Sequence, residues 1–448
     1  MSRLTAFNQM NEGSSGMRDP SRNERQTTRR HQMLPLLVDD ITVPVLYGLE
    51  NTLNWFDLMR NTMGNAAGVD GVQLRHLFRA DVARLCRPVI AAIHAGQYRP
   101  SRLRQVDILR PDGRVRTLRL LPLIERIVHG AAANYLTRAA ALRVGPNFHG
   151  SLPNRGVRTF LKAVERAVLE APPGQPLFVH EVDVARAFDN VRLSAAISVL
   201  NQMGFESGVV NTLQQIMTPD GASGEIIGLA QGHPFSPILF TLTMNACLQQ
   251  NANLSGGVGV LNPLVYVDNV AYISHQEQLI HRSIQMHTTS LGSAGLSYSS
   301  QFPPVDLRQQ GSKTTVLGNQ LTVEDNRAIF RFMPGRLARV TDGIRRLVLA
   351  PDPRSEVRNA LISYAASTGH VYATAGREYC MEVLTTLLAN SEATDADQNL
   401  ILRQWELAGG RWKGERDQRV VNPEMSPPGN PEWQQWNFDV NSLGEFDG

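Results

Sequence analysis

Two stretches in which an apolar run ends on an aspartate constrain the fold of this 448-residue chain more than any other feature. One is LVYVDNVAYIS at residues 264–274, where Asp268 and Asn269 separate two runs rich in Val, Tyr and Ile. Such runs favour strands and Asp-Asn tolerates a tight turn, so this stretch predicts a β-hairpin with a carboxylate at its tip. The other is FVHEVDVARAFDNV at residues 178–191, where a predicted strand leads into Asp183.

An aspartate at a hairpin tip is most often only a turn residue, so the hairpin alone does not identify a site. Two aspartates at strand ends can, however, lie on neighbouring strands, which are about 4.8 Å apart. Carboxylates that close repel each other unless a cation lies between them. Because polymerases and nucleases hold two Mg²⁺ ions about 3.5–4 Å apart in this way, Asp183 and Asp268 predict a site for divalent metal ions.

The composition indicates a globular chain without a membrane span. Hydrophobic residues make up 42% and charged residues 19% of the sequence, which is typical of a protein with a sizeable core. A net charge of +3 is weak evidence for a nucleic-acid partner, so clustering of the basic residues has to make that case. The sequence has no apolar run of membrane-spanning length, no apolar signal core at its N-terminus and no metal-type spacing among its three cysteines. We therefore expect a cytoplasmic protein.

The ordered motifs of the chain resemble those of reverse transcriptases. Three segments resemble the catalytic motifs of that family, in its order: DVARAFDNV at 183–191, QGHPFSPILF at 231–240 (their QGxPxSPxLF) and YVDN at 266–269 (their Y-x-D-D box). Flanking segments resemble the fingers and a lysine-bearing turn of the members related to group II introns and retrons: GVDGV at 68–72, the basic segment 98–118, the helix that begins LIERIVHG at 123, and GSKTTVLGNQL at 311–321. The resemblance covers roughly residues 65 to 335.

This resemblance implies an α+β right-hand polymerase fold: fingers, a palm whose antiparallel sheet is flanked by helices, and a C-terminal helical thumb-like region. The expected divisions are a flexible basic N-terminal arm at 1–33, fingers at 34–176, a catalytic palm at 177–333, the thumb-like region at 334–412 and an irregular C-terminal tail at 413–448. The alternative for the arm is a segment that becomes ordered on nucleic acid or on a partner protein.

The resemblance also implies the residues that bind metal and move protons. Asp183 and Asp268, with the backbone carbonyl of Val184, are the expected ligands of Mg²⁺, for which Mn²⁺ is an alternative. Lys313 is expected to donate a proton to the leaving pyrophosphate, which an arginine cannot do readily. Lysine is rare here, since 44 residues are Lys or Arg and only three are Lys, so a lysine in this turn favours that role over chance.

Five further residues are expected to contact the nucleotide. Arg110 and Arg116 lie on a predicted two-stranded ribbon, where arginines either bind phosphates or form a solvated face. Phe188 is either a core residue or, as the resemblance implies, the aromatic side chain that excludes a 2′-hydroxyl and so selects a DNA product. Gln231 and Gly232 are expected to contact the template–nucleotide pair. The neighbouring His233, where serine is usual, is left open between a polar contact and stacking on nucleic acid.

Asn269 is the main departure from the family pattern, because an aspartate usually stands there. An asparagine keeps one oxygen ligand but loses a negative charge, so it supports a neighbouring ligand more readily than it binds metal itself. The change raises three outcomes: an altered metal preference, slow synthesis or a non-catalytic relative. A further departure is Leu152, which stands where the fingers of the family commonly carry an arginine.

The function we predict is that of an RNA-directed DNA polymerase that extends a 3′-hydroxyl with dNTPs. Its expected partners are an RNA template such as a cognate non-coding RNA, the DNA product, and a partner protein or a second copy through the C-terminal helices. A stand-alone polymerase of this size suits a phage-defence or retron-like system. Two alternatives are an RNA-dependent RNA polymerase, which the Asp-Asn turn favours and Phe188 opposes, and a non-catalytic polymerase-fold scaffold, which Asn269, Leu152 and His233 favour.

Overall fold

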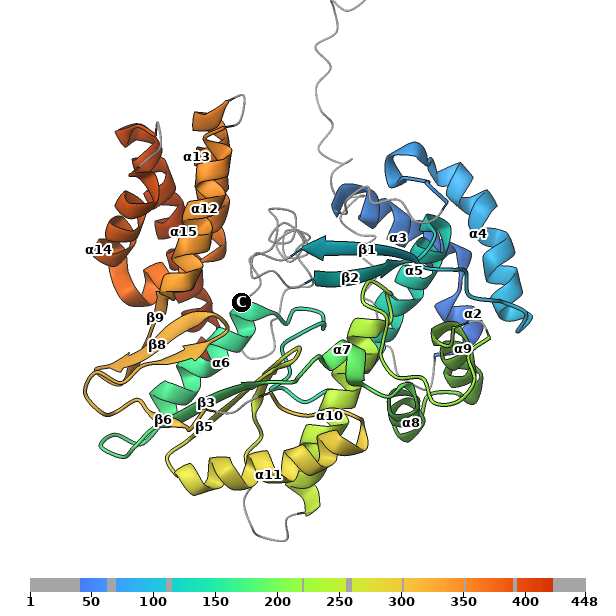
Figure 1. The fold of residues 1–448 in the computed structure, drawn as a ribbon, viewed down its shortest axis with the longest axis horizontal. Helices are drawn as coiled ribbons and strands as arrows, with labels where there is room; N and C mark the ends of the chain where they lie inside the picture. The colour runs from blue at the N-terminus through green and yellow to red at the C-terminus, as the bar shows by residue number, and fades with distance from the viewer. Residues whose placement is uncertain are drawn as a thin grey trace, which may run out of the picture. The chain divides into compact units, whose positions relative to one another are not determined.

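The computed structural model describes about four-fifths of the chain: residues 41–62, 70–109, 115–219, 221–254, 260–299, 302–349, 352–389 and 393–421. These residues mix helices with antiparallel sheets, as an α+β fold requires (Figure 1). The predicted arm at 1–33 and the tail beyond residue 421 lie outside the described residues. Within the described part, no helix is both long and apolar enough to cross a membrane.

The first group of elements surrounds a buried helix and ends in a two-stranded ribbon. These elements are α2 (Val43–Leu46), α3 (Leu49–Thr62), the short 3-10 helix η2 (Leu74–His76), α4 (Arg79–His94), β1 (Arg104–Leu109), β2 (Val115–Leu120) and α5 (Leu123–Ala140). Helix α5 is buried along most of its length, since its LIERIVHGAAANYL stretch has small or apolar side chains on nearly every face. The ribbon strands pair antiparallel, from Arg104 opposite Leu120 to Leu109 opposite Val115, as the sequence predicts.

A four-stranded antiparallel sheet follows, with the strand order β4-β5-β3-β6. Its strands are β3 (Phe178–Asp183), β4 (Leu264–Tyr266), β5 (Asn269–Ser274) and β6 (Val305–Asp306). The helices of this part of the chain are α6 (Val157–Glu170), α7 (Ala187–Asn190), α8 (Leu193–Gln202), α9 (Ser207–Met217), α10 (Ser236–Leu254) and α11 (Glu277–Ser293). The apolar run EIIGLA at 225–230 predicts a short strand, and that prediction is wrong, because the segment forms only an isolated bridge between Ile227 and Arg192.

A second, three-stranded antiparallel sheet lies next in the chain. Its strands are β7 (Thr314–Val316), β8 (Asn319–Glu324) and β9 (Arg327–Phe332). Helix α6 packs against both sheets, and its apolar face joins one hydrophobic core with Val179 of β3 and Phe330 of β9. This core ties the two sheets together beneath the strand that carries Asp183.

Four helices complete the described chain: α12 (Pro334–Leu347), α13 (Pro353–Ser367), α14 (Gly369–Leu388) and α15 (Asp395–Val421). They enclose a separate core around Trp405, and α14 is broken at Gly376, whose φ is 91°. One helix runs across the predicted boundary at residue 413. Helix α15 continues to Val421, and Trp412, which is 4% exposed, packs into the core of the two sheets rather than ending a thumb. The helical spacing of apolar residues is weak there, because one side of α15 packs against residues that are far away in the sequence.

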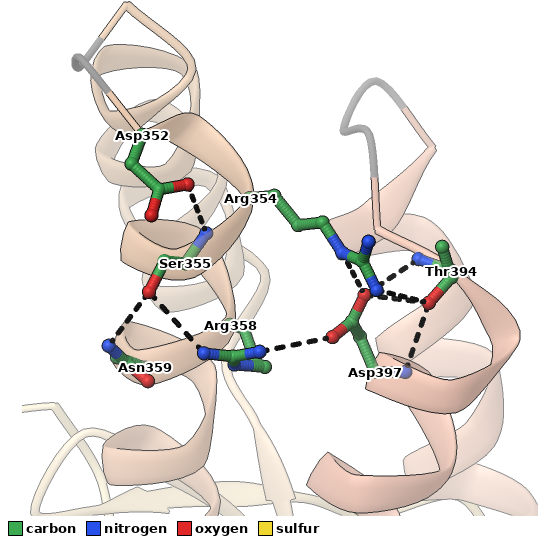
Figure 2. A network of polar contacts seen from close by, with 7 residues as sticks. All are labelled: Asp352, Arg354, Ser355, Arg358, Asn359, Thr394 and Asp397. Atoms are coloured by element: carbon green, nitrogen blue, oxygen red, sulfur yellow. Dashed lines mark hydrogen bonds and ion pairs between the residues drawn. The ribbon is translucent and has the colours of Figure 1, made fainter.

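A polar network joins the first turns of α13 and α15 (Figure 2). Thr394 and Asp397 form a reciprocal cap at the start of α15, in which each backbone N–H donates to the other side chain, at 3.0 and 3.4 Å. The Arg354 Nε lies 2.9 Å from the Asp397 carboxylate, and Arg358 approaches its other oxygen at 3.8 Å. Hydrogen bonds from Thr394, together with Arg354, hold the pKa of Asp397 at about 2. The two helices are therefore fixed by side-chain contacts as well as by their shared core.

Candidate active site

The end of strand β3 and the β4–β5 hairpin bring the two predicted aspartates to one edge of the sheet. Asp183 is the last residue of β3 and pairs with Asn269, the first residue of β5. The tip of the hairpin differs by one residue from the prediction: its two turn residues are Val267 and Asp268, and Asn269 already belongs to the strand, opposite Tyr266. Val267 has a φ of 54°, so the turn places a β-branched residue in the left-handed region in order to direct Asp268.

Backbone hydrogen bonds hold this edge on two sides. The Val184 N–H donates to the Asp268 carbonyl oxygen at 2.9 Å. On the opposite side, the Ser299 N–H donates to the Asp183 carbonyl and the Ala185 N–H donates to the Ser297 carbonyl, at 2.8 and 2.9 Å. Since the N–H and C=O of one extended residue point to the same edge, the carbonyl of Val184 also faces the hairpin. The backbones of Asp183, Val184 and Asp268 thus lie together at this edge of the sheet.

A third carboxylate, which no sequence motif marks, lies on the same face of β3. Glu181 is two residues before Asp183, and side chains two apart in a strand share a face. Burial raises the pKa of the Glu181 carboxyl to about 7, the Leu317 N–H opposes that rise, and the charge of Asp183 adds to it. Partial burial of its carboxylate also raises the pKa of Asp183, although the residue is exposed overall. The signal that could have found Glu181 is the alternation in Glu-Val-Asp.

The donor set fits a hard divalent cation. Two carboxylates and one backbone carbonyl are oxygen ligands of the kind that Mg²⁺ and Mn²⁺ prefer. Among the described residues, no group of three or more His, Cys, Asp or Glu side chains could hold a metal ion by itself. Water and substrate phosphates would therefore complete the coordination, which is the usual arrangement for Mg²⁺ at phosphoryl-transfer sites. The Asn269 amide lies 3.5 Å from the Asp268 carboxylate, where it can orient that ligand.

Phe188 lies on the short helix α7, directly after the aspartate strand. Its ring is partly buried and packs on Phe240 of α10 with ring centroids 4.8 Å apart. The Leu229 N–H donates to the Phe188 carbonyl oxygen at 2.7 Å, which fixes the backbone as well. Phe188 is therefore neither fully buried in the core nor free to rotate, so it can serve as a rigid wall for a sugar ring.

The Gln231–Gly232 turn joins the ribbon to this site. The Arg119 N–H of β2 donates to the Gln231 carbonyl oxygen at 2.7 Å, and the Gln231 amide donates to the Asp189 carboxylate at 3.4 Å. Gly232 has a φ of 99°, and a Cβ atom there would lie 3.1 Å from the carbonyl oxygen of Arg119. The glycine is thus required for the close approach of β2, a role inside the chain that the sequence did not reveal.

Two departures from the family pattern are core residues. His233 is 5% exposed, stacks on His129 with ring centroids 5.7 Å apart, and accepts a hydrogen bond from the Phe235 N–H at 3.3 Å. Burial lowers the pKa of His233 to about 4, so the ring is neutral at pH 7, and at 5% exposure the ring is not available to stack on nucleic acid. Leu152 is 6% exposed. Both substitutions therefore change packing rather than the surface that a substrate would meet.

Three predicted residues are not brought to the aspartates by any contact in the described part of the chain. Lys313 is exposed in the turn before β7 and makes no hydrogen bond or ion pair with the described residues. Arg116 lies on β2 opposite Ile108, and the structure describes only its backbone. Arg110 lies outside the described residues. The roles given to these three residues stay predictions.

Residues 108–301 match the family model of the reverse transcriptase (RNA-dependent DNA polymerase). The matched span contains Asp183, Phe188, Gln231 and Asp268, and it ends before Lys313 and the helices α12–α15. No curated protein is similar enough to match the chain. The chain therefore carries a reverse transcriptase domain with a polymerase palm-and-fingers fold. The family consists of nucleotidyltransferases that use divalent metal ions, dNTPs and an RNA template to make DNA.

Proposed function

We propose that this protein, which carries a reverse transcriptase domain, is an RNA-directed DNA polymerase. It would extend a 3′-hydroxyl with dNTPs by two-metal-ion catalysis. The observation that supports this most directly is the backbone contact between the two strands that carry the aspartates. Asp183 pairs with Asn269 across the sheet, and the next residue, Val184, donates its N–H to Asp268 at 2.9 Å. Two aspartates whose backbones are held together at a sheet edge suit the binding of cations that neutralise a reacting phosphate.

Each residue then has a task. Asp183, Asp268 and the Val184 carbonyl would hold Mg²⁺ or Mn²⁺, which when bound neutralises the triphosphate and lowers the pKa of the attacking hydroxyl. Asn269 orients Asp268 through its amide. Phe188 excludes a 2′-hydroxyl from the sugar site, because its ring is braced by Phe240 and cannot move aside.

Basic residues complete the proposed site. Arg110 and Arg116 of the ribbon bind the phosphates of the incoming nucleotide through their guanidinium donors. Lys313 donates a proton to the departing pyrophosphate. The hydrogen bond between Arg119 and Gln231 supports this arrangement, since it docks the ribbon on the turn that lies beside Asp189.

The experiment is nucleotide incorporation by purified protein. Labelled dNTPs or NTPs are supplied with Mg²⁺ or Mn²⁺, with a primed RNA template or without any template, and D268A serves as the control. Incorporation of dNTPs that depends on Asp268 and on RNA supports the proposal. Incorporation of NTPs in place of dNTPs would replace it with an RNA-dependent RNA polymerase.

A non-catalytic scaffold is the second candidate, and Asn269 favours it because the site has one carboxylate fewer than usual. The absence of nucleotide incorporation under every condition, with RNA still bound to the protein, would favour the scaffold. For the biological setting we propose a cytoplasmic phage-defence or retron-like system with a cognate non-coding RNA. Sequencing of the RNA that co-purifies tests this, and a random population of transcripts would contradict it.

The thumb-like region is also a proposal. Helices α12–α15 follow the second sheet directly and form their own core, which is where a polymerase carries its thumb. These helices are also the proposed contact for a partner protein or a second copy. Measurement of the oligomeric state in solution, with and without RNA, tests the latter.

A further inference from the structure

The turn between β7 and β8 is strained and lies against the catalytic strand. Its two residues, Leu317 and Gly318, both have positive φ, 44° and 65°, as in a type I′ hairpin turn. Leucine is disfavoured in that region, and such a conformation persists only where the surroundings fix it. The Leu317 N–H donates to the Glu181 carboxylate at 2.9 Å, and Glu181 is two residues before Asp183 on the same strand face.

Asn319, the residue after this turn, is 1% exposed and uses its whole hydrogen-bonding capacity. Its amide nitrogen donates to the carbonyl oxygens of Val316 and Leu317, at 3.3 and 2.9 Å. Its amide oxygen accepts from Arg336 Nη1 and His370 Nε2, both at 3.1 Å. Two donors on one side and two carbonyls on the other fix the orientation of the amide, so Asn319 cannot rotate without losing partners.

The two donors come from the C-terminal helices. Arg336 is in the first turn of α12, and its guanidinium lies over the rings of Phe332 and Tyr364, at 5.5 and 5.6 Å from their centroids. His370 is in the first turn of α14 and is 5% exposed. The placement of α12 and α14 therefore determines where the amide of Asn319 is held.

We propose that Asn319 is a positioning residue that couples the C-terminal helices to the catalytic strand, an inference that rests on the proposed polymerase function of Asp183. The connection runs from Arg336 and His370 through Asn319 to Leu317 and then to Glu181; we call these five residues the Asn319 network. A displacement of α12 or α14 changes the turn, and the turn changes the position of the strand end that carries Asp183. No residue of the network touches the reacting atoms.

The first experiment measures kinetics. N319D keeps the oxygen that accepts from Arg336 and His370 but loses both donors to the turn, so it cuts the network at one point. We expect kcat to fall about tenfold while KM for dNTP stays within about twofold, because the strand end matters most in the transition state. R331M is the matched control for the loss of an arginine side chain outside the network. Arg331 is on β9, pairs with Glu324 and does not contact Asn319.

A double-mutant cycle tests the coupling itself. R336M and E181Q change the two ends of the network, which make no contact with each other. If the network couples them, the kcat of the double variant will differ from the product of the single effects by about threefold or more. Multiplicative effects overturn the proposal. R331M combined with E181Q should give multiplicative effects in either case.

The second experiment does not depend on polymerase activity. Amide hydrogen exchange is measured for Leu317, whose N–H bonds to Glu181, and for Val184, whose N–H bonds to Asp268. We expect R336M to accelerate exchange at Leu317 about tenfold and at Val184 several-fold, and R331M to change neither. Acceleration confined to α12–α15 would overturn the coupling. If the wild-type chain makes no DNA, the proposed function fails, but this exchange result still decides whether the network transmits displacement.

Discussion

The edge of the sheet at Asp183 and the helices α12–α15 are held in opposite ways. At the sheet edge, backbone hydrogen bonds to Asp183, Val184 and Ala185 hold the chain, and none of these bonds uses the side chain of Asp183. The helices are held to one another by their side chains, in the core around Trp405 and in the network around Asp397 (Figure 2). The difference teaches that a site which must bind a ligand is fixed by its backbone, so that its side chains remain available.

The largest effect is expected from removing a carboxylate at the sheet edge. D183A should lower dNTP incorporation by about a thousandfold or more, which corresponds to about 4 kcal/mol of transition-state stabilisation. Its midpoint of thermal unfolding should not fall, because the backbone hydrogen bonds that hold the edge do not involve the side chain. Activity assays and calorimetry check both. Normal activity in D183A would remove Asp183 from the metal site.

The opposite pattern is expected in the helical region. Trp405 is fully buried, packs near Phe332 and Tyr364, and donates its indole N–H to Thr368 at 2.8 Å. W405A should lower the free energy of unfolding by about 3–5 kcal/mol. Denaturant titration measures this, and L400A, which removes a half-exposed leucine of the same helix, is the control. A loss below about 1 kcal/mol would mean that the helices do not depend on this core.

A smaller effect is expected at the sugar site. F188A should reduce the preference for dNTP over NTP about tenfold to a hundredfold, because a methyl group no longer blocks a 2′-hydroxyl. F240A provides a sharper comparison. It leaves Phe188 in place but removes the ring that braces it, so discrimination should fall less. Unchanged rejection of NTP by F188A would mean that Phe188 only packs.

The smallest effect, taken per pH unit, is expected on the stability of the fold. The folded pKa of His233 is about 4, below the usual value of 6.5, so between these values the unfolded chain binds the proton and the folded chain does not. Stability therefore falls as pH drops from about 6.5 to about 4, and this contribution changes no further below that range. H233F should reduce the slope of the unfolding free energy against pH by up to about 1.4 kcal/mol per pH unit, which is the slope that the uptake of one proton produces. An unchanged slope would show that His233 takes up no proton on unfolding.

Much of the sheet edge could be predicted because its signals are local. The strand before Asp183 and the hairpin at Asp268 follow from apolar runs and turn residues, and the structure confirms both to within one residue. The same local reasoning placed the ribbon strands of Arg116. It failed at residues 225–230, an apolar segment that forms one isolated bridge instead of pairing with a strand.

The sequence by itself determined most of the strands, helices and turns, and it predicted Asp183 and Asp268 as the carboxylates of the site. Only the tertiary structure decided the roles of Glu181, Gly232, Asn319 and Trp412. The Glu181–Leu317 hydrogen bond joins residues 136 positions apart, and Trp412 completes a core built from α6 and the two sheets. Periodicity and turn chemistry report the few residues beside a position. A partner brought in by folding leaves no such pattern, because any residue of suitable size and polarity at that distance can supply it.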